Sequence, residues 1–276
     1  MQLGWELKEL RDKAGFTLAQ ATEGLTFSSS KLHRVENGLT GLPKVQDLKD
    51  LLDRYGVENG EDVDFLVEIH RDSLNRGWWS VYRSVLPSGM SMYIGLESGA
   101  RSVRSWQPNV VYGVLQTERY AREMFLTAKS VEETTTEFVE RHTQIRMQRK
   151  ELLTRKDNPM ELWAILDEAT LRRVIGGPDV MREQYEEIIR LSQLDNVTIQ
   201  ILPANISTYR CSFNFALMDF GAPLPTVVQS DEADGSGLGD KDTTIWTFTR
   251  RFDALRAGAH APGETVTVLQ RLSREI

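Results

Sequence analysis

Helix start and stop signals recur at short intervals over residues 1–73, and this punctuation restricts the fold of the chain more than any other feature. Apolar residues repeat at helical spacing near the start, and Gly15 follows that stripe where a C-terminal cap is expected. Thr17 and Gln20 have the spacing of a capping box, and Pro43 stands where the first turn of a helix tolerates proline. The pattern predicts five short helices.

The composition changes after residue 73. Residues 74–95 contain two tryptophans, two tyrosines and a proline between helical segments, which indicates a structured connector. Residues 95–155 return to helical periodicity, and from Glu161 the pattern becomes mixed. The predicted strands are residues 161–166, 197–203, 213–220 and 225–230, with a helix over 178–194, an acidic, glycine-rich loop over 231–240 and closing helices over 243–259 and 263–276.

Together these patterns predict an α+β fold with two main parts. An all-α, five-helix domain covers residues 1–73 and a connector covers 74–95. A larger mixed α/β domain with closing C-terminal helices covers 96–276.

Composition limits the class of protein. Of the 276 residues, 40% are hydrophobic and 26% charged, and no apolar run reaches the ~20 residues of a membrane span. The start lacks the basic region of a secretory signal, and the single cysteine, Cys211, excludes a disulfide framework and leaves too little sulfur for a structural zinc site. We therefore expect a cytoplasmic protein without a membrane partner. The net charge of -7 argues against indiscriminate coating of nucleic acid, but not against a small basic face.

Residues 28–37 would form a short helix with two different sides. Leu32 and Val35 define the buried side, and Ser28 lies where an N-cap is needed. Hydroxyl, imidazole, guanidinium and amide groups, which pair with base edges and phosphates, occupy the opposite side and its flanks. These residues are Ser29, Ser30, Lys31, His33, Arg34 and Asn37. A capped helix, a tight turn and such a reading helix predict a helix-turn-helix arrangement, although a solvated helix face is the alternative.

Residues 3–55 resemble the phage-repressor, or XRE-type, class of helix-turn-helix domain. The stretch TLAQATEGLTFSSSKLHRVENG is similar to the two-helix core of that family in length and in its apolar positions. The resemblance implies that Ser29, Ser30 and Arg34 reach base edges in the major groove of double-stranded DNA. It also implies a structural ion pair between Arg11 and Glu36.

The chain departs from the pattern of that family at three positions. Thr22 replaces the usual small residue of the second helix, Thr26 replaces the glycine of the turn, and Leu18 replaces a glutamine that often opens the second helix. A β-branched residue in a left-handed turn would be strained, so we expect a rebuilt turn. Lost contacts to phosphates would be supplied by Thr17, Gln20 or Lys44.

Residues 77–276 look like the C-terminal module that follows such DNA-binding domains in actinomycete regulators of the WhiJ-like group. The similarity recurs in separate blocks, including WQPNVVYGVLQTERYAR, ELWAILDEATLRRVIGGPDVM and NVTIQILP. It implies that a small partner protein, encoded nearby, binds the chain.

Aromatic and amide side chains cluster within residues 106–120. Trp106, Tyr112, Gln116 and Tyr120 would suit the wall of a pocket for a small-molecule effector. Core packing accounts for the same residues and is the favoured interpretation.

The sequence offers little for catalysis. Asp167 and Glu168 follow a predicted strand and could act as acid and base, but the cap of the next helix is the favoured interpretation. The four histidines lack the spacing of metal ligands, and the familiar nucleotide-binding and hydrolase motifs are missing. We expect no enzyme activity, no metal and no cofactor.

The favoured hypothesis is a sequence-specific transcriptional regulator that acts as a homodimer and senses a ligand or a partner protein. A single short reading helix specifies too few base pairs, which is the reason for expecting two copies. The alternative is an antitoxin-like interaction protein that holds a small partner, with DNA binding secondary. The operator, the effector and the sign of regulation stay open.

Overall fold

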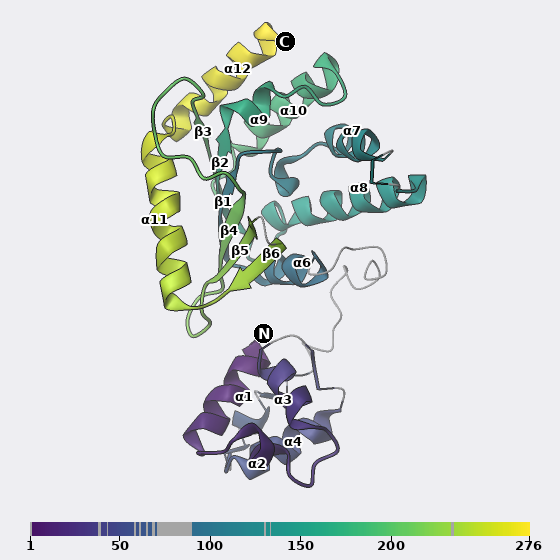
Figure 1. Cartoon of the computed structure of the whole chain (residues 1–276), viewed down its shortest axis with the longest axis vertical. Helices are drawn as coiled ribbons and strands as arrows, with labels where there is room; N and C mark the ends of the chain where they lie inside the picture. The colour runs from purple at the N-terminus through teal and green to yellow at the C-terminus, as the bar shows by residue number, and fades with distance from the viewer. Residues whose placement is uncertain are drawn as a thin grey trace. The chain divides into compact units, whose positions relative to one another are not determined.

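The computed structural model describes residues 2–37, 40–42, 44–57, 59–60, 62–64, 66–67, 70, 90–129, 131–132, 134–232 and 235–276. The chain forms two compact units, Met1–Ser80 and Val81–Ile276 (Figure 1). Most of the expected connector, including Trp78 and Trp79, lies outside the described residues. The last residues of this connector, 90–95, belong to helix α6. The expected boundaries of the helical domain, the connector and the larger domain stay predictions.

The first unit is helical, as its sequence predicts. Its helices are α1 (Gln2–Lys13), α2 (Leu18–Thr22), α3 (Ser29–Glu36) and α4 (Val45–Arg54). Further helical residues are described at 60, 62–64, 66–67 and 70, and they overlap the fifth expected helix over residues 63–74. Lys44 takes the N-cap position of α4, so this helix begins later than the expected start at Pro43, which lies outside the described residues.

One apolar cluster holds the four helices of the first unit together. Leu7 of α1, Leu32 of α3 and Leu51 of α4 are fully buried in it. The stripe predicted for α1 is buried at its beginning, whereas Leu10 is half-buried and Ala14 is exposed. Helical periodicity therefore identified the inward side of α3 and of the first half of α1.

A six-stranded mixed sheet is the centre of the second unit. Its strands are β1 (Ser102–Gln107), β2 (Glu161–Asp167), β3 (Val197–Leu202), β4 (Phe215–Asp219), β5 (Val227–Glu232) and β6 (Gly235–Gly239). The order across the sheet is β3-β2-β1-β4-β5-β6. Strands β1, β2 and β3 are parallel, and β4, β5 and β6 continue the sheet in antiparallel pairs.

Two strands correct the sequence analysis. Residues 102–107 form β1, in a stretch expected to be helical, and residues 235–239 form β6, in a stretch expected to be a loop. Strand β1 is stabilised by two neighbours, with Ser105 opposite Ala164 of β2 and Ala216 of β4. Glycine-rich β6 has low strand propensity, and pairing with β5 supplies the structure that its own residues do not favour.

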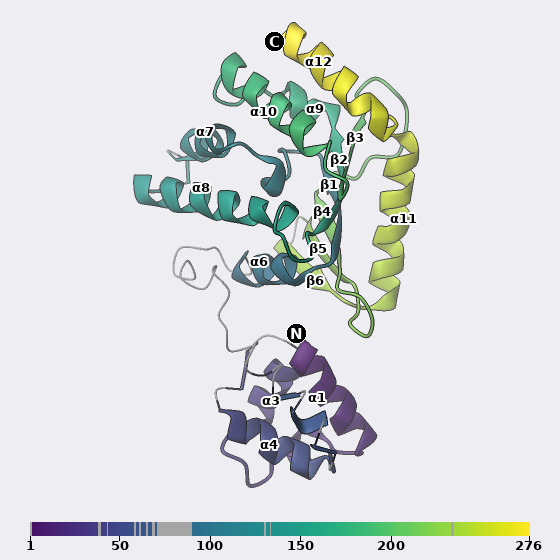
Figure 2. The same ribbon diagram turned by 180° about the vertical axis from the view of Figure 1, so that it is seen from behind.

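Helices cover both faces of the sheet (Figures 1 and 2). Helices α6 (Met90–Gly99), α7 (Glu118–Ala128), α8 (Thr136–Lys150), α9 (Glu168–Arg172) and α10 (Pro178–Leu191) lie on one side. Helix α11 (Asp242–Gly258) covers the other side, and α12 (Thr265–Glu275) packs beside α10. Short 3-10 helices lie in the connections between these elements: η2 (Gly113–Leu115), η3 (Glu151–Leu153) and η4 (Pro262–Glu264).

The sheet separates two apolar cores. Tyr120 and Tyr185 are buried in the larger core under α6–α10, and Phe215 and Phe252 are buried in the smaller core under α11. The predicted closing helices correspond to α11 and α12, and the predicted α+β class is confirmed. Among the described residues, no helix has the length and apolarity needed to cross a membrane.

Candidate nucleic-acid interface

Helix α3 begins at a serine cap. Ser28 has extended backbone angles, and its Oγ accepts a hydrogen bond of 3.3 Å from the backbone N–H of Lys31. Leu32 and Val35 turn into the core, as the helical wheel predicts. The assignment of Ser28 to the cap is confirmed, and the hydroxyls of the next two serines are left for other contacts.

The outward side of α3 is polar and open. Ser30, His33 and Arg34 are exposed, while Ser29 and Lys31 are half-buried on the flanks. Within the described residues, no hydrogen bond or ion pair engages the side chains of Ser30 or Arg34. Their donors and acceptors are therefore available to a ligand that approaches this side.

Asn37 closes α3 instead of pointing freely outward. Its Nδ2 donates a 2.7 Å hydrogen bond to the carbonyl oxygen of His33 and lies 3.3 Å from Nδ1 of the same residue. The backbone N–H of Asn37 also bonds the His33 carbonyl. This amide satisfies the end of the helix, so Asn37 has a capping role, and its predicted contact with DNA stays a prediction.

The ion pair implied by the resemblance is present. Nε of Arg11 donates to Oε1 of Glu36 at 2.7 Å, and a second guanidinium nitrogen donates to Oε2 at 3.0 Å. Arg11 also donates to the carbonyl oxygen of Phe16 at 2.8 Å. The hydrogen bond to Glu36 raises the pKa of Arg11. This two-point contact fixes the end of α3 against α1, so Arg11 belongs to the scaffold.

The turn between α2 and α3 is rebuilt, as Thr26 predicts. The residue in the left-handed region is Gly24, with φ of +74°, and Thr26 is not among the described residues with positive φ. The hydroxyl of Thr26 instead donates to Oδ1 of buried Asp47 at 2.8 Å. A glycine earlier in the turn thus removes the strain that a threonine would carry there.

Helix α4 also holds the end of α2. A guanidinium nitrogen of Arg54 donates to the carbonyl oxygens of Ala21 at 3.0 Å and Glu23 at 2.6 Å. These are carbonyls that the short α2 cannot satisfy within itself. Arg54 and Asp47 together connect α4 to both ends of the α2–α3 turn.

The three residues expected to contact phosphates, Thr17, Gln20 and Lys44, differ in their local hydrogen bonds. Thr17 and Gln20 form the predicted capping box, in which the Thr17 hydroxyl donates to Oε1 of Gln20 at 2.8 Å and accepts from its backbone N–H. Both side chains are exposed, and the amide nitrogen of Gln20 keeps its donors free of hydrogen bonds among the described residues. Lys44 is exposed and makes no side-chain cap.

The charge near α3 suits an anionic ligand. Between residues 17 and 44 the acids are Glu23 and Glu36, and Glu36 is buried against Arg11. Lys31, Arg34 and Lys44 lie in the same stretch. In this stretch Lys31, Arg34 and Lys44 therefore outnumber the one exposed acid, Glu23, which favours specific rather than indiscriminate DNA binding by an acidic chain.

Of the four residues of the candidate effector pocket, Trp106 lies apart from the other three. Trp106 is buried in the core under α11, and its Nε1 donates to the carbonyl oxygen of Cys211 at 2.9 Å. Tyr112 and Tyr120 are buried in the core on the opposite face of the sheet. Gln116 is also buried and donates to the carbonyl oxygen of Val111 at 2.7 Å. Their burial agrees with core packing, the favoured interpretation.

A buried polar network that no sequence pattern predicted lies beside η2. Oε2 of Glu97 accepts from Nε of Arg149 at 2.6 Å, and Oε1 accepts from another guanidinium nitrogen at 2.8 Å and from the hydroxyl of Tyr112 at 2.5 Å. Burial raises the pKa of Glu97, but Arg149 outweighs it and the pKa is lowered. These residues come from separate segments, so spacing carried no signal for them.

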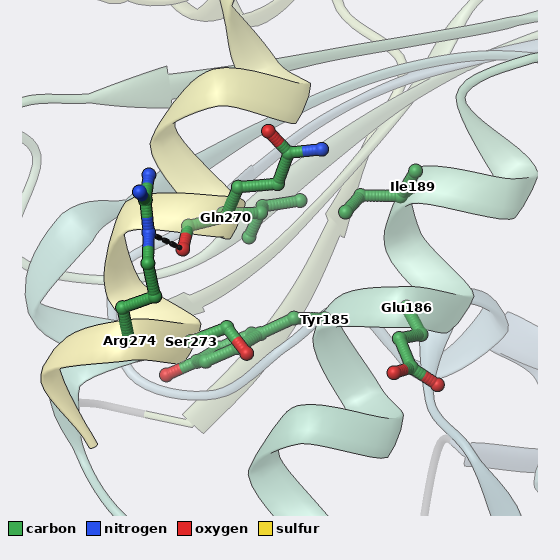
Figure 3. A pocket seen from close by; sticks show the side chains of 7 residues that line it. Tyr185, Glu186, Ile189, Gln270, Ser273 and Arg274 are labelled. Atoms are coloured by element: carbon green, nitrogen blue, oxygen red, sulfur yellow. Dashed lines mark hydrogen bonds between the residues drawn. The ribbon is translucent and has the colours of Figure 1, made fainter.

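An open groove is lined by residues of α10 and α12, which pack side by side (Figure 3). Its volume is about 430 Å³, and Tyr185 forms part of its wall. The Tyr185 hydroxyl donates to the carbonyl oxygen of Leu171, and burial raises the pKa of this tyrosine to about 12. The lining residues are Tyr185, Glu186, Ile189, Leu269, Gln270, Ser273 and Arg274.

The acidic pair at the end of β2, Asp167 and Glu168, is engaged in structural contacts. Asp167 caps α9, accepting from the backbone N–H of Ala169 at 2.9 Å, which confirms the favoured interpretation. Glu168 accepts from Arg172 at 2.8 Å and from Arg271 at 3.0 Å.

Comparison with known proteins assigns both parts of the chain. A family model described as a helix-turn-helix domain matches residues 2–66, and a model described as a domain of unknown function, DUF5753, matches residues 90–271. Neither the curated proteins nor the solved structures give a match.

Proposed function

The chain belongs to the family defined by the domain of unknown function DUF5753, and from this premise we propose that it is a sequence-specific transcriptional regulator of the XRE type. Its helix-turn-helix domain supports a DNA-binding regulator. The observation that carries the proposal is the exposed, uncommitted face of α3 with Ser30 and Arg34, held on a scaffold by the Arg11–Glu36 pair.

In the proposed complex α3 enters the major groove. Arg34 has the planar donors that pair with O6 and N7 of guanine, and Ser29 and Ser30 bond to neighbouring base edges. Lys31, Lys44 and the free amide of Gln20 contact phosphates, which position the helix without reading the sequence. Since the basic surface is small, one copy binds weakly, and we propose a homodimer on two half-sites about 34 Å apart.

The second unit receives the signal in this proposal. The groove between α10 and α12 mixes apolar, amide and charged side chains, a combination that suits a small-molecule effector. A small partner protein, as in the WhiJ-like group, is the other source of signal. The proposal includes no catalytic step, in keeping with the capping role of Asp167 and the two arginines on Glu168.

Binding to duplexes from the promoter region of the gene itself tests the proposal. Fluorescence anisotropy of the full-length protein at low salt should show specific affinity above that for a scrambled duplex. Arg34→Ala should weaken specific binding by about 1–3 kcal/mol and relax the preference at one base pair. Lys8→Ala, which removes an exposed charge from α1, is the matched control. Absence of binding, or equal affinity in Arg34→Ala, would refute the proposal.

A further inference from the structure

The outer side of α11 exposes an unusual residue. Trp246 is 61% exposed, and the guanidinium of Arg250 lies 4.7 Å from the centre of its ring. Figures 1 and 2 show α11 on its own side of the sheet, opposite α6–α10. Tryptophan and arginine are the residues most enriched where protein surfaces meet, so this pair marks a candidate interface.

Four residues form a stripe along the middle of the broader exposed side of α11. Trp246, Arg250, Asp253 and Ala257 are all exposed and are spaced by four, three and four residues. This is the spacing of the seam between two packed helices, and it covers about 17 Å of helix. The opposite side of α11 carries Phe252 into the core, so the stripe points away from the sheet.

A loop with exposed apolar residues lies against the flank of α11 at its C-terminal end. Space beside Gly258, at the end of α11, is filled by Thr208, whose Cβ would lie 3.0 Å from a β-carbon added to the glycine. Ile206 and Tyr209, on either side of Thr208, are each 41% exposed. Three of the large apolar side chains exposed in the described chain thus belong to α11 and this loop.

We propose that this surface binds a second copy of the chain, with the two α11 helices antiparallel. The pairing is centred between Arg251 and Phe252. In that register Trp246 faces Ala257 of the other copy, and Arg250 faces its Asp253. Each pair occurs twice, once in each direction, because the two-fold axis relates the copies.

Size and charge both favour this register. A large ring meets a small residue, and a guanidinium meets a carboxylate, so the surface complements itself. Asp253 is available for the contact, because its ion pair within the chain, to Arg256, is long at 3.8 Å. A parallel arrangement would place Trp246 against Trp246 and like charges against each other.

The interface deepens the proposed function by naming the surface that joins the two DNA-binding copies. The interface rests on the proposed function only for its biological role, which is to join two DNA-binding copies. Mass in solution is measured without DNA, so failure of the interface and failure of DNA binding are separate outcomes.

Two charge reversals in the full-length protein test the register. Arg250→Asp places aspartate against aspartate, and Asp253→Arg places arginine against arginine, twice in each homodimer. We expect a dimer for the original chain and at least about tenfold weaker self-association for each variant, measured by sedimentation and light scattering. Mixed in equal amounts, the two variants should form a heterodimer, because every facing pair is then opposite in charge.

Controls separate the interface from folding. Circular dichroism should show intact secondary structure in both variants, since the residues are exposed. Val174→Glu, at another exposed apolar position, should leave the dimer unchanged. A monomeric original chain, a dimer that survives both reversals, or the lack of a heterodimer on mixing would each overturn the proposal.

Discussion

Gly4 of α1 packs directly on the end of α3. A β-carbon at this position would lie 2.9 Å from the carbonyl oxygen of Glu36 and closer still to that of Val35. The two helices can approach this closely because glycine has no side chain. The placement of the reading helix therefore depends on a residue that makes no contact with DNA in the proposed complex.

Gly4→Ala should force α1 and α3 apart. We expect a loss of stability of about 1–3 kcal/mol, together with weaker specific DNA binding, because backbone carbonyls cannot move aside as a flexible side chain can. Thermal unfolding and anisotropy would measure both effects. Gly41→Ala is the matched control, since a β-carbon there meets no atom within 4 Å. Equal behaviour of the two variants would contradict the close approach.

Ser28 and Ser30 should differ in what they affect. Ser28→Ala removes the N-cap of α3 and should lower stability by about 1 kcal/mol. Ser30→Ala should leave the melting temperature nearly unchanged and alter the preferred base sequence, because its hydroxyl has no partner among the described residues. Selection of bound duplexes from a random pool measures the preference. If both variants only melt earlier, the division of roles is wrong.

Glu97→Gln should destabilise the second unit strongly. It leaves the Arg149 guanidinium buried without its opposite charge, which costs about 3–5 kcal/mol. Chemical denaturation of the full-length protein would show the loss. The matched control is Glu118→Gln, which breaks an exposed pair with Arg122 and should change stability by less than about 1 kcal/mol.

The network also implies a loss of stability in acid. The pKa of Glu97 is below its ordinary value of 4.5 in the folded chain, so its contribution is complete above that pH. It disappears as the pH falls through the lowered pKa, where the carboxylate takes up a proton.

His142 should make the free energy of unfolding depend on pH in a higher pH range than Glu97 does. Burial lowers its pKa below 6.5, and its Nδ1 lies 2.9 Å from the carbonyl oxygen of Phe138. Its Nε2 is buried without a partner in the described structure, so protonation would create an unsatisfied donor. The neutral ring is favoured by folding, and stability should decrease as the pH drops from about 6.5 toward the lowered pKa.

His142→Phe removes this titration. The free energy of unfolding of the variant should fall less steeply between pH 7 and pH 5.5 than that of the original chain, whatever their difference at pH 8. Denaturant titrations at each pH give the two curves. Parallel curves would show that His142 does not titrate in this range.

Features whose interacting residues lie close together in the sequence could be predicted from it. The capping box of Thr17 and Gln20 and the serine cap at Ser28 involve residues three positions apart, so spacing alone identified them. Periodicity also located the buried side of α3 and of the first half of α1, and Thr26 predicted a turn without a left-handed residue at its own position. Which exposed residues of α3 read bases stays a prediction.

Features that depend on distant neighbours were not readable. Strand β1 forms because it pairs with β2 and β4, and glycine-rich β6 forms because it pairs with β5. The residue propensities of these two short segments therefore predicted the wrong secondary structure. The placement of the candidate pocket residues also depends on distant neighbours. Trp106 lies within β1 and faces one core, whereas Tyr112 follows the strand and enters the other.

The contacts of α4 determine how small a fragment can be and still keep the geometry of the α2–α3 pair. Arg54 satisfies the carbonyl groups at the end of α2, and Asp47 accepts from Thr26 in the turn. A synthetic peptide spanning only α2 and α3 would lack both supports, and short isolated helices are marginal in water. The smallest fragment able to keep the geometry of the helix pair therefore extends from α1 through α4, and a transplant of the two helices alone onto another protein would need equivalents of Arg54 and Asp47.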